Sequence, residues 1–142
     1  MSGFLLDTNT VSELVSVKPN QRVVDWLEAS DESQLYLSVM TLGEIRQGVA
    51  ALPQSKKRTA LETWLEVDLQ SRFAGRVLPV DGAVANRWGW LMAESQGKGM
   101  TLPVVDCLLA ATALQHNLTV VTRNARDFAV TGLRVANPWE ET

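Results

Sequence analysis

The sequence predicts an α/β fold in which a central, mostly parallel β-sheet is covered by helices on both faces. Short apolar segments typical of buried strands alternate along the chain with longer segments of helical periodicity. Strands that are joined through helices pair in parallel, and each face of such a sheet needs a helical cover. With 142 residues, 46% of them hydrophobic, the chain suits a single domain over residues 1–142.

Five segments are expected to be strands: Phe4–Leu6, Leu35–Ser38, Arg76–Leu78, Thr119–Thr122 and, at the edge of the sheet, Leu133–Ala136. Helices are expected over Gln21–Ala29, from Thr41 to about Leu52, over Ser55–Phe73, from Asp81 to about Gly97, and from Pro103 to His116. Asp81 is a good helix cap, Pro103 suits a first helical turn, and Asn117 suits a helix end.

Composition excludes several classes of protein. The single cysteine, Cys107, rules out an internal disulfide and is expected to be a small buried residue. The N-terminus lacks the basic region of a signal peptide, and no apolar stretch approaches the ~18 residues of a membrane span, so we expect a cytoplasmic protein without membrane contact. The net charge of −3 argues against a passive coat on long nucleic-acid duplexes, but not against a nuclease with clustered carboxylates.

Four acidic residues follow strands or begin helices. Asp7 directly follows the first strand, and Asp127 follows the strand at Thr119–Thr122. Glu44 and Asp106 are each expected in the first turn of a helix. Ligand sites of open parallel sheets form beyond the carboxyl ends of the strands. We therefore expect Asp7, Glu44 and Asp127 to share one edge, where Asp106 joins them if its helix begins there.

Carboxylates gathered at one partly buried site repel each other, so either one keeps a proton or a cation compensates. Ligands that offer only oxygen suit Mg²⁺ or Mn²⁺ rather than zinc. Asp7 and Asp106 are the expected metal ligands, and Glu44 and Asp127 would complete the catalytic site directly or through water. Such an ion can clamp a phosphodiester and activate water for hydrolysis.

Each acid also has a purely structural interpretation. Thr41 and Glu44 have the spacing of a capping box, and Asp7 could form a turn that opens a helix. Asp106 could simply favour a helix N-terminus, and Asp127 could be an ordinary loop residue. However, the apolar neighbours of Asp106 suggest burial, which is costly for a lone carboxylate. The common edge and the order of the four acids favour a functional site.

Three stretches of sequence resemble a known family: LLDTNTVSE (residues 5–13), LSVMTLGEIRQG (37–48) and DCLLAATALQHNLTVVTRNARDF (106–128). Together with the closing NPW, they resemble PIN-domain ribonuclease toxins of the VapC class, including the FitB-like subgroup of type II toxin–antitoxin systems. The resemblance spans essentially the whole chain. Its specificity lies in the combination and order of the motifs, because each is weak alone.

The resemblance implies a three-layer α/β/α sandwich, Mg²⁺-dependent endoribonuclease activity and a homodimer. It also implies inhibition by a cognate antitoxin, through which DNA would be contacted indirectly. Asp7, Glu44 and Asp106 match the first three acids of the family by position. The fourth position is either Asn124 or Asp127, because family members differ there, and Asn124 would add no negative charge.

Several other residues are candidates for smaller roles. Three polar residues are expected beside the acids, where they could orient water or a carboxylate, although turn and cap chemistry explains them equally well: Thr8, Asn9 and Thr122. Three arginines neighbour the acids in sequence and could contact RNA: Arg46, Arg123 and Arg126. The basic run at residues 56–58 is expected to be a solvated helix start. Trp88 and Trp90 cannot share a helix face, so one of them could lie at a subunit interface.

The function expected from these observations is endoribonucleolytic hydrolysis by metal-activated water, without a covalent intermediate. Two alternatives stay open. The protein could be a regulatory module that acts in a DNA-bound complex with its antitoxin, or it could be a structure-specific DNA nuclease.

Overall fold

A computed structural model of the chain describes residues 3–128, 130 and 132–140. Its five strands form one sheet in the order β3-β2-β1-β4-β5, and every neighbouring pair is parallel. The strands are β1 (Gly3–Leu6), β2 (Leu35–Ser38), β3 (Val77–Leu78), β4 (Leu118–Val121) and β5 (Val135–Ala136). The predicted fold class is confirmed. The predicted Leu133–Ala136 strand is two residues too long at its start.

The helices of the first half are α1 (Thr8–Ser12), η1 (Glu13–Val15), α2 (Gln21–Ala29), η2 (Glu32–Gln34) and α3 (Val39–Ala50). The second half contains α4 (Lys56–Thr63), η3 (Trp64–Leu69), α5 (Gln70–Arg72), α6 (Gly82–Gly97), α7 (Val104–Gln115) and η4 (Ala125–Phe128). The expected Ser55–Phe73 helix corresponds to α4, η3 and α5 in succession, and η3 has π-helical geometry. Among the helices of the described residues, none has the length and hydropathy that a membrane crossing requires.

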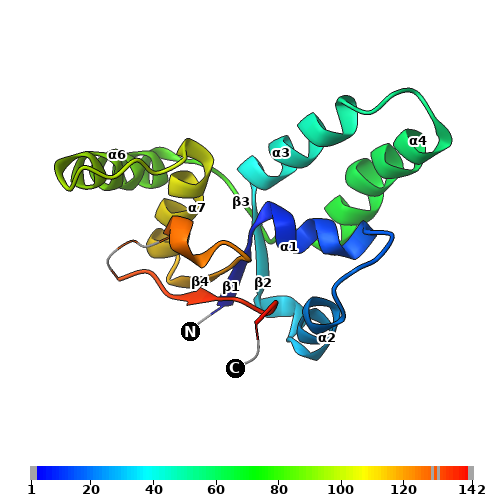
Figure 1. The fold of residues 1–142 in the computed structure, drawn as a ribbon, viewed down its shortest axis with the longest axis horizontal. Coiled ribbons are helices and arrows are strands. Elements are labelled where there is room, and N and C mark those ends of the chain that lie inside the picture. Colours follow the sequence, from blue (N-terminus) through cyan, green and yellow to red (C-terminus); the bar gives the residue numbers. More distant parts are fainter. Residues whose placement is uncertain (1–2, 129, 131, 141–142) are drawn as a thin grey trace.

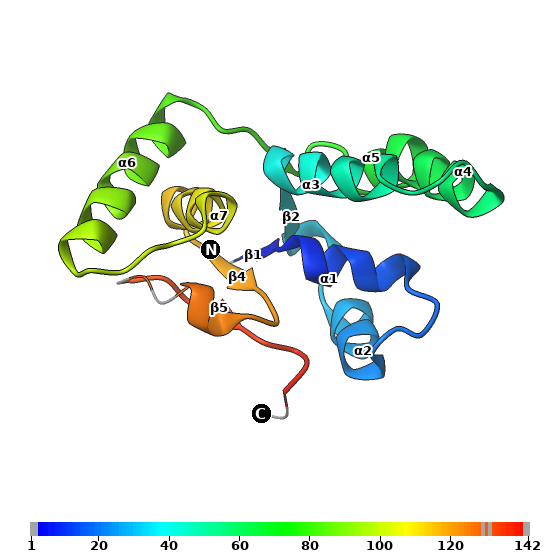
Figure 2. The same cartoon turned by 45° about the horizontal axis from the view of Figure 1, so that its top comes forward.

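The sheet separates two helical layers. Figures 1 and 2 show α6 and α7 on one side of the strands, and α1, α2, α3 and α4 on the other. Neighbouring strand residues point to opposite faces, so Leu6 and Val121 enter the core under α2 and α3, whereas Leu5 and Val120 enter the core under α7. Both faces are therefore apolar, as expected for a parallel sheet buried between helices.

Short polar side chains determine where the helices begin. Asp81 Oδ1 accepts a hydrogen bond from Val84 N at 2.9 Å and caps α6, as predicted. Asn117 ends α7 with φ 55°, a left-handed conformation that asparagine tolerates better than most residues. Ser38 Oγ accepts from Met40 N at 3.0 Å and caps α3. Because α3 begins at Val39, the predicted start at Thr41 is wrong and Glu44 lies in the second turn.

Candidate active site

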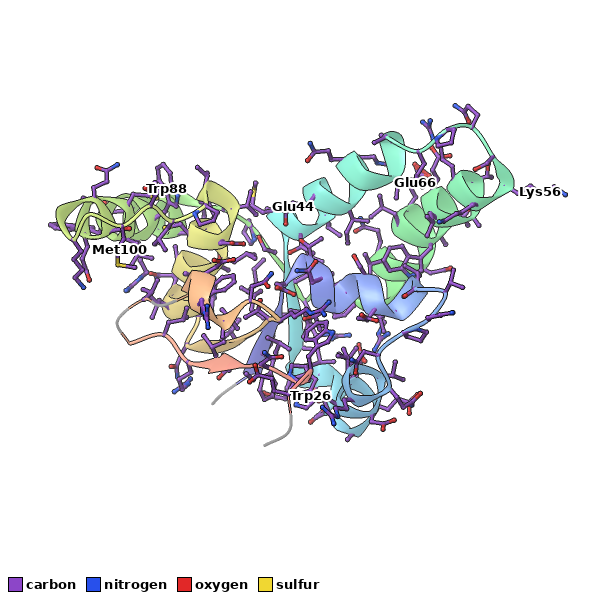
Figure 3. The ribbon with its side chains drawn as sticks, viewed as in Figure 1. Trp26, Glu44, Lys56, Glu66, Trp88 and Met100 are labelled. Atoms are coloured by element: carbon purple, nitrogen blue, oxygen red, sulfur yellow. The ribbon has the colours of Figure 1, made fainter. Side chains whose placement is uncertain are left out.

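The four acidic residues lie at the carboxyl edge of the sheet. Asp7 directly follows β1, and Asp127 lies in η4, shortly after β4. Glu44 comes from α3, which continues directly from β2, and Asp106 lies in the first turn of α7. Figure 3 shows Glu44 on the first half of α3.

Asp106 shows that the four carboxylates interact. The pKa of Asp106 is raised from 3.8 to about 6, first because burial disfavours the charged carboxylate, then because of the negative charges of Asp127, Glu44 and Asp7. The charges of the other three acids thus reach Asp106 across the carboxyl edge of the sheet. Their catalytic roles are a separate question and are addressed below.

Asp7 is the most buried of the four, with 6% of its surface exposed. Its Oδ1 accepts hydrogen bonds from Thr10 N at 2.9 Å and Thr10 Oγ1 at 2.8 Å, so Asp7 caps α1 as its structural interpretation requires. Burial nevertheless raises the pKa of Asp7, although hydrogen bonds from Thr122, Thr10 and Asn9 oppose the rise. Asp7 is thus both a helix cap and a member of the carboxylate cluster.

Thr122 connects Asp7 to the loop after β4. Its Oγ1 accepts a hydrogen bond from Asn124 N at 3.0 Å, which leaves its own proton free for the hydrogen bond with Asp7. Asn124 therefore supports the cluster through its backbone, while its side chain is exposed. The orientation of Asp7 is fixed from two sides, by the start of α1 and by this loop.

Glu44 accepts a hydrogen bond from the Oγ1 hydroxyl of Thr8, which is the first residue of α1. This contact across 36 positions of sequence replaces the expected capping box, and that interpretation of Glu44 was wrong. Thr41 is fully buried, and its Oγ1 has no hydrogen-bond partner in the described part of the chain. Thr8 is thus placed beside an acid, as the sequence predicted.

Asp127 is exposed, and its backbone N–H donates to Asn124 O at 3.0 Å. Of the three neighbouring charges, that of Asp127 raises the pKa of Asp106 most. Asp127 is thus close enough for its charge to act on Asp106, and its assignment to the fourth position in place of Asn124 stays a prediction.

The three candidate arginines separate in the fold. Arg46 Nη2 lies 2.9 Å from Glu66 Oε1 on η3. Arg46 comes two residues after Glu44 along α3, so the two side chains lie on nearly opposite faces of the helix. Arg46 therefore neighbours Glu44 in sequence only, and its contact with RNA stays a prediction. Arg123 and Arg126 line a hollow of about 320 Å³ together with Asp127. Lys56 begins α4 at the far tip of the molecule, as expected for a solvated helix start (Figure 3).

The carboxylate cluster has the donor chemistry of a site for a hard divalent cation, since every acid offers oxygen. Among residues 3–128, 130 and 132–140, no three histidine, cysteine or acidic side chains lie close enough to enclose one ion. Mg²⁺ is usually held by one or two carboxylates and keeps several waters, so it does not require three protein ligands.

Sequence reasoning missed Thr10, which positions Asp7 through both its backbone and its hydroxyl. Its place three residues after an aspartate cap was an available signal, because the N3 residue of a helix meets the capping side chain. The hydroxyl is also 3.0 Å from Val121 O on β4, a contact that no local sequence pattern indicates.

A model of the PIN domain family matches residues 4–132. The chain belongs to the PIN-domain family. The match includes Asp7, Glu44, Asp106 and Asp127, so the carboxylate edge described above lies within the PIN domain. The predicted three-layer PIN architecture is therefore confirmed.

Known PIN proteins resemble this chain over nearly its full length. It is 40% identical to VapC ribonuclease Y4jK of Sinorhizobium fredii, covering 96% of this chain and 97% of the relative. It is 41% identical to Toxin FitB of Neisseria gonorrhoeae, covering 96% and 99%. The structure of FitAB bound to an IR36 DNA fragment contains a chain that superposes with a TM-score of 0.92 at 39% identity, covering 98% and 97%.

Proposed function

We propose that this PIN-domain protein is a metal-dependent endoribonuclease and the toxin component of a type II toxin–antitoxin system. The observation that supports this most is the cluster at Asp106, whose pKa is raised to about 6 by burial and three neighbouring carboxylates. A clustered acid whose pKa is strongly perturbed is a physical signature of functional sites. Relatives that are 40% and 41% identical are named a VapC ribonuclease and a toxin. Such an enzyme would act in the cytoplasm, where its RNA is found.

In this proposal Asp7 and Asp106 hold the cation, and Glu44 and Asp127 hold or deprotonate the attacking water. A bound Mg²⁺ or Mn²⁺ would supply Lewis-acid activation of the phosphodiester and of water. Burial and hydrogen bonds fix Asp7 in one orientation, which lowers the cost of arranging the site. The hydroxyl of Thr8 holds Glu44 in a similar way.

Cleavage of end-labelled RNA tests the enzymatic part. Purified protein should cut single-stranded or structured RNA in Mg²⁺ or Mn²⁺, and EDTA should stop it. Asp7→Asn should abolish cleavage while the chain stays folded, because the amide has nearly the shape of the carboxylate but removes a ligand charge. Asp68→Asn, on the exposed surface of η3, is the matched control and should cut normally. Undiminished cleavage in EDTA would exclude the mechanism.

We also propose that an antitoxin docks beside the carboxylates. A largely apolar groove of about 560 Å³ runs between η1, α3 and α4, and Thr8 and Glu44 line one part of it. An antitoxin segment in this groove could place an arginine against the carboxylates, where a guanidinium pairs well with two acids and competes with metal. An inhibited complex with no antitoxin cation near Asp7 or Asp106 would contradict this proposal.

The homodimer belongs to the same proposal. On the side of α6 and α7, three large apolar side chains are exposed: Trp90 by 72%, Val104 by 54% and Met100 by 41%. Trp88 on the same helix is half-buried, so the two tryptophans do face differently. A contact between two copies would cover this surface. Sedimentation should show a dimer at micromolar concentration, and Trp90→Lys should shift it toward the monomer.

A second candidate function is regulation in a DNA-bound complex, which the similarity to the FitAB structure on DNA supports. The two functions make different predictions for Asp7→Asn. If regulation is the main role, this variant and the parent repress equally and neither cuts RNA. A DNA-specific nuclease would instead cut matched DNA substrates in Mg²⁺ and leave RNA intact.

A further inference from the structure

A polar hollow of about 560 Å³ lies next to the carboxylates, at the same edge of the sheet. Side chains from α1, η1, the loop after β4 and the C-terminal tail line it: Asn9, Ser12, Glu13, Arg123, Asn124 and Trp139. We call it the Trp139 hollow. In Figures 1 and 2 the tail after β5 runs toward α2, and the backbone oxygen of Trp139 accepts a hydrogen bond from Arg22 of that helix.

We propose that the Trp139 hollow binds an unpaired nucleobase of the RNA substrate, stacked on Trp139 beside the scissile phosphate. This inference rests on the proposed ribonuclease function and adds a site that selects the substrate. Sequence-specific RNA recognition usually stacks splayed bases on aromatic rings or guanidinium planes and reads their polar edges.

Trp139 is a preformed platform. Its backbone N–H donates to Asn137 Oδ1 at 3.0 Å, and Asn137 Nδ2 donates to Arg123 O at 3.2 Å. Arg22 Nη1 donates to Trp139 O at 3.2 Å. The indole is half-buried against the core between the sheet and α2. A ring fixed in this way loses little conformational entropy when a base stacks on it.

Arg123 provides the opposite side of the stack. Its guanidinium carbon lies 6.0 Å from the centre of the Trp139 ring, at the outer limit of a cation–π contact. A base inserted between the two groups would need a stacking distance of ~3.5 Å to each, so the Arg123 side chain would have to move outward from its present position. The Arg123 side chain is exposed and free to make this movement.

The lining favours a base over a phosphate or a simple anion. Amides and hydroxyls dominate it, and they offer the donors and acceptors that base edges require. Glu13 is held in place because its Oε2 accepts from Asn20 N at 3.0 Å. Its carboxylate would repel a phosphate but can accept a hydrogen bond from an exocyclic amino group.

The hollow is directly connected to the carboxylates. Asn9 lies two residues after Asp7, and the Asn124 backbone bonds the Thr122 hydroxyl that contacts Asp7. Arg123 and Asn124 also line the neighbouring hollow of about 320 Å³ that contains Asp127 and Arg126. An RNA strand whose scissile phosphate lies at the carboxylates can therefore place an adjacent base on Trp139 and its sugar–phosphate backbone near Arg126.

The test separates binding from cleavage. In an Asp7→Asn background, binding of a fluorescent single-stranded RNA is measured in Mg²⁺, and each nucleotide is replaced in turn by an abasic one. One abasic position should weaken binding by roughly 5- to 100-fold, the range of a lost base–aromatic stack. In Trp139→Leu, which keeps apolar packing but lacks a π-face, the same abasic RNA should bind like the intact RNA.

The Arg123→Lys substitution keeps the surface charge but removes the planar guanidinium group. It should therefore reduce the loss of RNA binding caused by the abasic nucleotide, which we call the abasic penalty. Arg87→Lys, the same change on the exposed surface of α6, should leave that penalty unchanged. These surface variants keep the test valid if Trp139→Leu fails to fold.

Three results have distinct meanings. If the parent cuts RNA but the abasic penalty is the same in Trp139→Leu and Arg123→Lys, the nucleobase site is wrong. If Trp139→Leu alters antitoxin inhibition alone, the hollow binds protein and the proposal is overturned. If base-dependent binding requires Trp139 but the parent cuts no RNA, the nucleobase site stands and the ribonuclease function fails.

Discussion

Replacing Asp106 with asparagine should stabilise the metal-free protein while it abolishes cleavage. The pKa of Asp106 is raised from 3.8 to about 6, so its charged form is less favourable in the folded chain than in the unfolded chain. Without screening, this difference corresponds to ~3 kcal/mol. Because the side chain is only half-buried, solvent screening reduces the expected gain to ~1–2 kcal/mol, or a rise of ~3–8 °C in melting temperature.

The effect should depend on pH in one direction. Below pH 3.8 Asp106 is protonated in both states, so the variant and the parent should have the same stability. Between pH 3.8 and about 6 the carboxyl group ionises in the unfolded parent but keeps its proton in the folded parent, so the parent loses stability relative to the variant, and above about 6 the difference is complete. Thermal melts in EDTA from pH 4 to 8 measure this difference. Asp68→Asn is the control, because it removes one charge from an exposed surface position.

Added metal should reverse the order. Mg²⁺ at ~100 times its Kd would stabilise the folded parent by ~2.7 kcal/mol. The variant has lost a metal ligand, so Mg²⁺ should stabilise it less. The parent should then melt above Asp106→Asn. If the variant is less stable than the parent at pH 8 in EDTA, carboxylate repulsion does not raise the pKa of Asp106, and the metal-site argument loses its main support.

Three further changes test individual residues. The Asp127→Ala variant should cleave RNA more slowly than the Asn124→Ala variant and should need a higher Mg²⁺ concentration, because only Asp127 adds negative charge. The cleavage rate of each variant is measured against Mg²⁺ concentration. The reverse result would assign the fourth position to Asn124. The Thr10→Val substitution should lower the free energy of unfolding by ~1–3 kcal/mol, because Asp7 loses a buried hydrogen-bond donor. It should also raise the pKa of Asp7, so the pH–rate profile should shift to higher pH. Gly3→Val should lower the melting temperature, because even a Cβ at Gly3 would lie 2.9 Å from Gln34 O; an unchanged melt would show that the start of β1 adapts.

Local sequence patterns were enough to predict the fold class, the strands to within two residues, and the edge of the sheet at which the acids lie. These features follow from local physics: apolar runs form buried strands, helix caps are read from short polar residues, and the ends of parallel strands meet at one edge. The order of Asp7, Glu44, Asp106 and Asp127 along these elements was sufficient to predict the carboxylate cluster.

The contacts between side chains from distant segments depend on how the elements pack. Ser38 and Thr41 are both plausible caps by spacing, but the direct passage from β2 into α3 selects Ser38 and frees Glu44 to meet Thr8. Arg46 pairs with Glu66 because α3 lies against η3. Trp139 reaches α1 from the far end of the chain because β5 pairs with β4. Sequence periodicity reports which face a residue occupies, but the order of strands and the packing of helices determine what that face contacts.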